Sequence, residues 1–391
     1  MSDHNARASS LGFSYQPRYA LLLLLQSDSN ANLFVERFDD IEIQEINGSK
    51  KVFELKHKKA GDLSDSSSDL WKTLKIWIDL YHDEKIDLDT TELMIITIAE
   101  AKNNSAASKL GKENRDPSKA REILVKFASE ATGGTLKEHR EAFLQLDDIE
   151  QLKLLERIHV LDSSPSVIDL KDEIVKELKH TARKEHREAF FERLEGWWND
   201  QILNHLVNAS STPISAATLE AKVADLREQF FANNLPIDFA NLQLSTEKEM
   251  SAKEKIFVKQ LELIMLTEPR IMHAIYDYYK AYNQRLKWIK DDLIYFDELE
   301  KFEMRLIEEW DRRFVKMNEE LGTNPDKQTI IHEGRKIYEW VEMDADFCIR
   351  PRCTDPYIVR GTYQMLSDDV KIGWHTEFRK QLEHLLIGGR K

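Results

Sequence analysis

The sequence predicts an α/β domain, with a mixed sheet flanked by helices, followed by a mostly α-helical C-terminal domain. Three observations support this prediction: a strand–turn–strand pattern near the N-terminus, a continuous apolar run at residues 93–98, and long helical patterns throughout the second half. The length of 391 residues suits two domains. We expect these at 1–210 and 211–391, because residues 208–213 form a short break between helical patterns.

The first elements are predicted from local patterns. Residues 12–25 are typical of an opening helix, in which Pro17 is tolerated because it falls in the first turn. A strand is expected at 33–38. Residues 40–46 then alternate strictly between polar and apolar side chains, which places Asp40 on the polar face of a second strand.

A tight hairpin is expected to follow. Asn47 and Gly48 both accept positive φ, and residues 51–56 return as the partner strand. Glu54 and Lys56 are two positions apart, so they project from the same face of that strand.

The remaining elements follow from periodicity and length. The apolar run at 93–98 is typical of a strand covered by helices on both faces. An apolar stripe along residues 276–299 is expected to be core or an oligomer seam. The other expected elements are a strand at 158–161 and helices at 69–78, 118–131, 136–146, 184–206, 216–232, 247–266 and 269–321, the last as one long or two abutting helices.

Composition excludes several classes of protein. Cys348 and Cys353 are the only cysteines and lack zinc-site spacing, so we expect two buried thiols in a reducing cytosol rather than a disulfide scaffold. No apolar run approaches the roughly 18 residues that a membrane span needs, and no secretory signal is visible. The expected location is therefore cytoplasmic. No Walker A loop is present, so the chain itself should not hydrolyse ATP.

The charge balance is acidic overall and basic in places. A net charge of −14 argues against a general polyanion binder. However, residues 50–60 hold five lysines against one glutamate, and residues 101–140 hold nine basic against five acidic side chains. The positive charge is therefore concentrated after the hairpin and in the following helical region.

The hairpin carries the chemistry. Asp40 lies on one strand, and Glu54 and Lys56 lie on its partner. Two carboxylates on neighbouring strands can share a hard divalent cation whose octahedron is completed by water and phosphate oxygens, which suits Mg²⁺, with Mn²⁺ as a substitute. The adjacent ammonium can orient water or neutralise charge in the transition state. A solvated strand face is the alternative for Glu54 and Lys56.

This pattern resembles the PD-(D/E)xK nuclease superfamily. Gly12-Phe13-x-Tyr15-Gln16, with Glu36-x-x-Asp39-Asp40-Ile41, is similar to the Cap-four-type nuclease domains of bacterial antiphage effectors. Those domains often carry Gln-x-Lys, so Glu54 is a departure, and the usual proline before the aspartate is absent. The resemblance covers roughly residues 10–100. It implies a restriction-endonuclease-like fold and a metal-dependent endodeoxyribonuclease acting on double-stranded DNA.

Roles are carried over residue by residue. The resemblance implies that Asp40 and Glu54 bind the metal and that Lys56 is the catalytic base partner or charge stabiliser. Gln16 could reach the metal or its water, or it could simply be a polar residue at a helix start. Glu36 is a further possible metal ligand, or an acidic residue at a strand edge.

The cations after the catalytic strand would contact the substrate. His57, Lys58 and Lys59 would meet DNA phosphates, or they would only keep a sheet edge soluble.

The C-terminal end carries a second resemblance. Ile372-Gly373-Trp374-His375-x-x-Phe378 is similar to the tail of effectors in ABC-type three-component defence systems. With the chain's size and domain order, it resembles the effector of Lamassu, also called the Ddm plasmid-defence system. This implies an SMC-like ATPase and a small bridging subunit that restrain the nuclease, and oligomerisation on activation. Trp374 and His375 are expected to pack or dock rather than act as catalytic groups.

Two further points follow from this reading. One metal site nicks one strand, so a double-strand break requires a homo-oligomer, a dimer or a tetramer, which we expect the helical half to form. The alternative function is a non-catalytic structural subunit with a degenerate nuclease fold. A sequence-specific restriction enzyme ranks last, because no classical DNA-binding motif follows residue 210.

Overall fold

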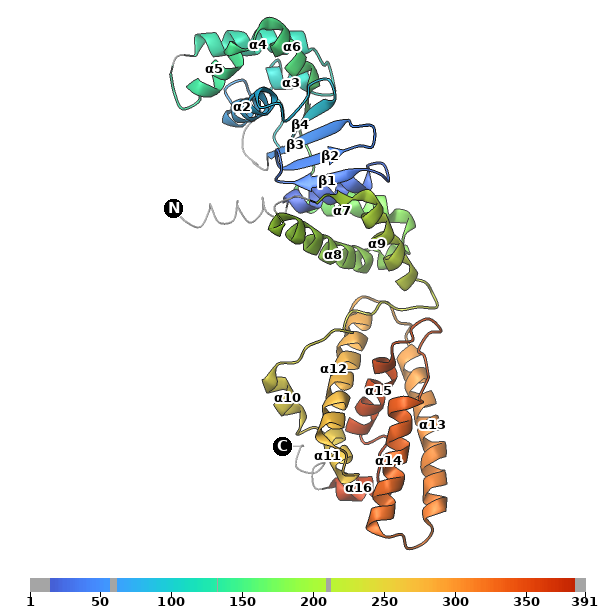
Figure 1. Cartoon of the computed structure of the whole chain (residues 1–391). Coiled ribbons are helices and arrows are strands. Elements are labelled where there is room, and N and C mark those ends of the chain that lie inside the picture. Colours follow the sequence, from blue (N-terminus) through green and yellow to red (C-terminus); the bar gives the residue numbers. More distant parts are fainter. Residues whose placement is uncertain (1–14, 57–61, 132, 209–211, 384–391) are drawn as a thin grey trace. The chain divides into compact units, whose positions relative to one another are not determined.

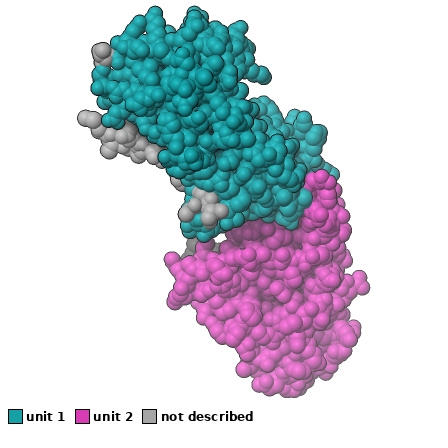
Figure 2. Space-filling model, turned by 45° about the horizontal axis from the view of Figure 1, so that its top comes forward, with its two compact units in different colours: residues 1–225 teal, residues 226–391 magenta. Residues whose placement is uncertain are grey.

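The computed structural model describes residues 15–56, 62–131, 133–208 and 212–383. The chain forms two compact units, residues 1–225 and 226–391, coloured separately in Figure 2. The division lies after the expected boundary near residue 210. The reason is that strand β6 (Ile214–Ser215) pairs with the first strand of the sheet, which keeps the following residues with the first unit.

The first unit is built on a mixed six-stranded sheet in the order β5-β4-β3-β2-β1-β6. Figure 1 labels its strands β1 to β4. Strands β1, β2, β3 and β6 pair antiparallel, whereas β3, β4 and β5 are parallel to one another. The carboxyl ends of these three parallel strands therefore meet at one edge of the sheet. The strands other than β6 are β1 (Asn32–Val35), β2 (Ile41–Gln44), β3 (Lys50–Lys56), β4 (Thr91–Thr97) and β5 (Ile158–Leu161).

The predicted hairpin forms, but its loop has three residues, 46–48, rather than the two of a tight Asn47-Gly48 turn, because the Glu45 N–H donates to the Ser49 carbonyl at 2.9 Å. Gly48 has φ +85°, and the Oδ1 atom of Asn47 accepts the Ser49 N–H at 2.9 Å. Ile41 lies opposite Phe53 in the β2–β3 register. Continuing that register by one residue places Asp40 opposite Glu54.

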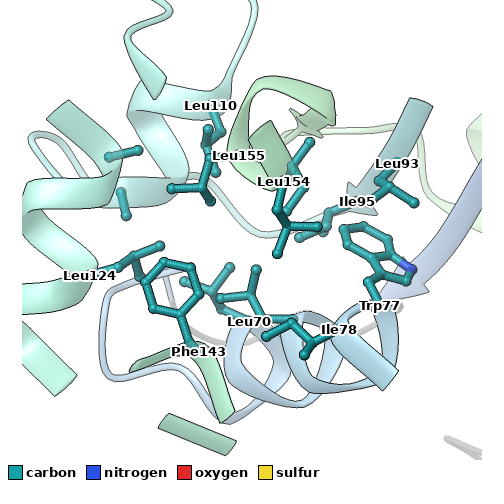
Figure 3. Close-up of a cluster of buried hydrophobic side chains, with 14 of the residues drawn as sticks. Leu70, Trp77, Ile78, Leu93, Ile95, Leu110, Leu124, Phe143, Leu154 and Leu155 are labelled. Atoms are coloured by element: carbon teal, nitrogen blue, oxygen red, sulfur yellow. The ribbon is translucent and has the colours of Figure 1, made fainter. Parts of the chain in front are cut away.

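One face of the sheet carries a large apolar cluster. Leu93 and Ile95 of β4 face Trp77 and Ile78 of helix α2, all of them buried (Figure 3). The amphipathic pattern at 69–78 explains this packing, because its apolar stripe is directed at the sheet. The helices of this layer are α2 (Ser68–His82), α3 (Ala106–Leu110), α4 (Pro117–Glu130), α5 (Lys137–Gln145) and α6 (Asp148–Arg157). The short helix α3 is not among the elements that the sequence predicted.

A further group of helices in this unit includes the opening helix and α8 (Arg187–Val207). Residues 15–25 are helical, and the Trp198 indole N–H donates to the Pro17 carbonyl at 2.7 Å. His205 Nε2 accepts the Val35 N–H at 3.0 Å, which ties α8 to the edge of β1. The same group contains α7 (Val167–Glu177) and α9 (Ala216–Gln229).

The second unit is helical in the residues described, as predicted. The expected helix 247–266 is divided in two, and the expected 269–321 segment is two helices separated at residues 291–297. Asp292 adopts φ +53° at that break, a left-handed conformation that ends the helix. The helices are α10 (Thr246–Ala252), α11 (Ile256–Leu263), α12 (Glu268–Lys290), α13 (Glu298–Leu321), α14 (Lys327–Met343), α15 (Pro356–Asp368) and α16 (Phe378–Gln381).

The apolar stripe on α12 is partly exposed. Side chains on its opposite face, such as Ile275 and Trp288, fill the core, whereas Tyr282, Leu286 and Ile289 are 40%, 48% and 57% exposed. The sequence allowed this stripe to be either core or an oligomer seam. The exposure of these three side chains excludes a place in the core for them. No helix in the described ranges is both long and apolar enough to cross a membrane.

Candidate active site

The predicted catalytic residues that the structure describes converge at the carboxyl end of β3. Asp40 lies directly before β2, and its Oδ2 atom accepts the Leu55 backbone N–H at 2.7 Å. This bond fixes the carboxylate between Glu54 and Lys56 of the neighbouring strand. The hairpin register thus brings together residues that are separated by a turn in the sequence.

Gln16 reaches the site from the opening helix. Its Nε2 donates to Glu36 Oε1 and to the Asp40 carbonyl, each at 2.8 Å. The side-chain amide therefore holds the two ends of the β1–β2 connection. Gln16 is a partner of two other predicted site residues, rather than an isolated polar residue at a helix start.

Glu36 has a strained backbone. Its φ is +53°, and its N–H donates to the Asp40 carbonyl at 3.1 Å. A left-handed conformation is uncommon for a non-glycine residue, and such strain is often found where a site must be held in shape. The Glu36 side chain is exposed and bonded to Gln16.

Glu54 and Lys56 form an ion pair on β3. The Glu54 side chain is 9% exposed and the Lys56 side chain 18%. Both lie on the sheet face that α2 covers, so the alternative of a freely solvated strand face does not apply to them. A pair at this depth holds the lysine ammonium beside the carboxylate.

Two neighbouring aspartates experience strong desolvation. Burial raises the pKa of Asp40 to about 6; the Leu55 hydrogen bond opposes this rise, while the charges of Asp39 and Glu36 add to it. Burial also raises the pKa of Asp39 to about 6, opposed by the hydrogen bond from Trp77 Nε1 at 2.8 Å and by the Lys56 cation. Sequence reasoning did not select Asp39, although its position directly before Asp40 was visible.

The carboxylates fit one kind of magnesium site. In the ranges described, no group of three or more His, Cys, Asp or Glu side chains gathers as a metal cage. Mg²⁺ is commonly held by one or two carboxylates, with water and substrate phosphate completing the octahedron. Asp40 and Glu54 fit this kind of site. Burial, and to a lesser degree the charges of Asp39 and Glu36, raise the pKa of Asp40, and a divalent cation would favour its charged form.

A buried ion pair next to the site was missed by the sequence patterns. Glu42 is completely buried on β2, and its Oε2 accepts from Arg37 Nε at 2.7 Å. The Arg37 guanidinium also lies over the Phe34 ring, 3.4 Å from its centroid. Alternation had grouped Glu42 with the polar face, but α2 and its neighbours cover that face, so the carboxylate needs a partner.

The predicted DNA contacts Lys58 and Lys59, together with His57, lie outside the described residues.

The tail motif packs inside the second unit. Trp374 is fully buried, and a Cβ on Gly373 would overlap the Phe378 ring, so only glycine fits there. Burial lowers the pKa of His375. Packing, rather than catalysis, is the role that this geometry supports.

The expectation of two buried thiols is correct for one of them. Cys353 is buried, whereas Cys348 is partly exposed because it lies in the loop after α14.

The second unit matches a known protein family. Residues 257–382 match C-terminal domain 7 of the ABC-three component (ABC-3C) systems. The match includes the tail motif, so the resemblance to three-component systems is confirmed at that level. It indicates a component of an ABC-three component system.

Solved structures give weaker similarities. The Acinetobacter baumannii Cap4 SAVED/CARF-domain containing receptor with the cyclic trinucleotide 3'3'3'-cAAA superposes with a TM-score of 0.35 at 14% identity, covering 70% of this chain and 59% of that chain. The Moraxella osloensis Cap4 SAVED/CARF-domain containing receptor gives 0.33 at 13%, covering 70% and 68%. This chain spans less than two thirds of the Acinetobacter receptor. At these scores no shared overall fold is assigned, and no curated protein sequence matches.

Proposed function

We propose that this protein is a Mg²⁺-dependent DNA endonuclease, the effector of an ABC-three component antiphage or antiplasmid system of the Lamassu type. The observation that carries the proposal is the meeting of Asp40, Glu54 and Lys56 at the carboxyl end of β3. The matched C-terminal domain supports the system, and the PD-(D/E)xK-like pattern supports the chemistry.

The residues have distinct parts in this proposal. Asp40 and Glu54 would hold Mg²⁺, which when bound lowers the pKa of a water molecule and polarises the scissile phosphate. Lys56, fixed beside Glu54, would orient the attacking water and offset negative charge on the phosphate. Gln16 would keep the Glu36–Asp40 connection in the shape that presents the Asp40 carboxylate.

Regulation in this proposal depends on partners. An SMC-like ATPase and a small bridging subunit would restrain the nuclease, and release would allow it to oligomerise. The acidic net charge agrees with such restraint, because a single acidic chain attracts DNA poorly.

One observation favours the second candidate, a non-catalytic structural subunit with a degenerate nuclease fold. Glu54 is already paired with Lys56, and the described ranges hold no metal group of three side chains. Such a subunit would scaffold the complex without binding Mg²⁺.

Plasmid nicking separates the two candidates. Purified protein, alone and with its partner subunits, is incubated with supercoiled plasmid and Mg²⁺, Mn²⁺ or a chelator. An endonuclease relaxes the plasmid only with metal, and Asp40→Asn removes the activity while the variant stays folded. Equal cutting by the wild type and this variant would refute the proposed site. A complete lack of cutting and of metal-dependent thermal shift would favour the scaffold.

A further inference from the structure

A hollow of about 700 Å³ opens beside β4 and β5. We call it the β4–β5 hollow. Its wall includes Val160 and Leu161 of β5, together with the loops that follow both strands and the segment after α3. This volume is in the range of ligand sites, about 300–1,000 Å³. Open α/β sheets bind ligands at the carboxyl ends of their parallel strands, where this hollow lies.

The hollow and the candidate active site share one edge of the sheet. Lys56, at the end of β3, is in register with Thr97, at the end of β4. The Thr97 carbonyl in turn accepts the N–H of Ser164, which lines the hollow. Neighbouring strands are about 4.8 Å apart, so the hollow begins roughly one or two strand spacings, about 5–10 Å, from Lys56. A strand of DNA rises about 3.4 Å per nucleotide, so this is a distance of about two or three nucleotides.

The lining has the chemistry of a backbone contact. Hydroxyls, amides and ammoniums are the groups that proteins most often place on DNA phosphates and sugars. Lys109 and Lys112 have no ion-pair partner in the ranges described, unlike many lysines of this chain. The hydroxyl and amide donors that the lining offers are Asn103, Asn104, Asn114 and Ser163. The hydroxyls of Ser108 and Ser164 also line the hollow, but they donate to the Ser105 and Leu161 carbonyls, each at 2.8 Å.

Backbone strain shapes the wall. Asn104, Asn114 and Ser163 all have positive φ, of 60°, 54° and 49°. Each lies in a different loop of the hollow. Left-handed turns in three separate loops direct the chain around the concavity, at a conformational cost that is largest for the serine.

Carboxylates also line the hollow. Asp162 has a structural role, because its Oδ2 accepts the Ala101 N–H at 2.8 Å and so connects the loops after β4 and β5. Glu100 and Glu113 have no cationic partner in the ranges described, and they would repel phosphates. The lining therefore holds two ammoniums against three carboxylates, so its net charge does not attract phosphates and only local contacts with the two lysines can. Removing the lysines and neutralising the glutamates should then change DNA affinity in opposite directions.

We propose that the β4–β5 hollow binds the sugar–phosphate backbone of the DNA strand that passes the candidate active site. This inference rests on the proposed function, since it assigns to the same enzyme a surface that binds the DNA strand a few nucleotides away from the cleaved phosphate. Lysine contacts supply the attraction, and the glutamates limit it.

The test compares charge changes inside and outside the hollow. Full-length Asp40→Asn protein, which should not cut, is titrated against a short labelled duplex by fluorescence anisotropy at several salt concentrations. The double variant Lys109→Ala/Lys112→Ala should bind about tenfold more weakly at low salt and lower the salt slope by about one to two. Glu100→Gln/Glu113→Gln should bind more tightly. Lys126→Ala and Glu130→Gln, exposed on α4 outside the hollow, are the matched controls and should change affinity less than about twofold.

The outcomes separate this inference from the proposed function. Opposite shifts from the two hollow variants, with inert controls, support the inference even if wild-type protein fails to cut DNA. Binding by the hollow variants that equals that of the controls overturns it, even if the wild type cuts. A duplex that does not bind at low salt also overturns it.

Discussion

The Asp40 carboxylate is held by the neighbouring strand, because its Oδ2 accepts the Leu55 backbone N–H at 2.7 Å. The bond comes from the β2–β3 register, in which Ile41 lies opposite Phe53. It leaves the second carboxylate oxygen available and keeps the group beside the Glu54–Lys56 pair. The geometry of the candidate site therefore depends on the hairpin register, and the short loop that contains Asn47 and Gly48 sets that register.

The stability of the metal-free protein should depend on the charge of Asp40. The folded-state pKa of Asp40 is raised to about 6. The contribution of this carboxyl to the free energy of unfolding is therefore most favourable below its ordinary pKa near 4, and it is lost as pH rises through about 6. Asp40→Asn should therefore raise the melting temperature at pH 8 by about 2–4 °C, for an effect of about 1 kcal/mol, and by little at pH 4.5. Differential scanning calorimetry with a chelator measures this. A variant less stable than the wild type at pH 8 would contradict the expectation.

Lys56 should be required for cutting, whereas Lys51 should not. Both lie on β3, but alternation directs them to opposite faces of the sheet. Lys56→Ala should lower plasmid nicking at least about 100-fold, because it removes the cation beside the phosphate. Lys51→Ala is the matched control and should retain activity. Equal activity of the two variants, at equal folded content by circular dichroism, would exclude the assigned role.

The Arg37–Glu42 pair should be needed for stability. Glu42 is fully buried, so Arg37→Met leaves an uncompensated charge and should cost about 3 kcal/mol, or roughly 6–12 °C in melting temperature. Arg37→Met/Glu42→Leu should recover most of the loss, because the charge is then absent. Chemical denaturation measures both free energies of unfolding. A double variant as unstable as the single one would indicate that Arg37 acts mainly through its packing on Phe34.

Magnesium should stabilise the wild type through Asp40. If the ion binds with a dissociation constant near 1 mM, 10 mM Mg²⁺ should add about 1.4 kcal/mol by mass action. Asp40→Asn should abolish the shift, and Lys51→Ala should keep it. Thermal unfolding with and without Mg²⁺ provides the measurement. A shift of the same size in Asp40→Asn would place the metal elsewhere.

Oligomerisation should depend on the exposed stripe of α12. Leu286 is 48% exposed, and Leu286→Glu should reduce any dimer or tetramer to smaller species, because it places a charge in an apolar seam. Val315→Glu on α13, where Val315 is 47% exposed, is the matched control. Light scattering coupled to size-exclusion chromatography gives the mass. An unchanged oligomer in Leu286→Glu would exclude this stripe, and a fully active monomer would exclude the requirement for assembly.

Several elements could be predicted because their signals are local. The Asn47-Gly48 turn, the strand containing Glu54 and the apolar run at 93–98 each depend on a few consecutive residues. The existence of these elements follows from the period of a strand and from the turn preference of Asn-Gly. The facing of Asp40 toward Glu54 does not, because a two-residue turn at 47–48 would set Asp40 opposite Leu55, whereas the observed three-residue loop, 46–48, shifts the register by one position. The predicted positions of helix ends and breaks were less accurate. At residues 291–297, for example, a single left-handed residue ends the helix although the apolar pattern continues.

Other features depend on segments far apart in the chain. Periodicity alone did not determine that Gln16 would bridge Glu36 and the Asp40 carbonyl, since the opening helix is positioned by its packing in the first unit. It could not show that Glu42 is buried, because burial depends on which helices cover that face.

By itself, the sequence determined the existence of the hairpin, the shared face of Glu54 and Lys56, and the helical character of the second half. Only the tertiary structure decided which of those side chains are desolvated, which meet across elements, and which apolar stripe stays exposed. The physical reason is that backbone preferences act within a few residues, whereas desolvation and ion pairing depend on what packs against a side chain from elsewhere. The raised pKa of Asp40 and the β4–β5 hollow both arise at this second level.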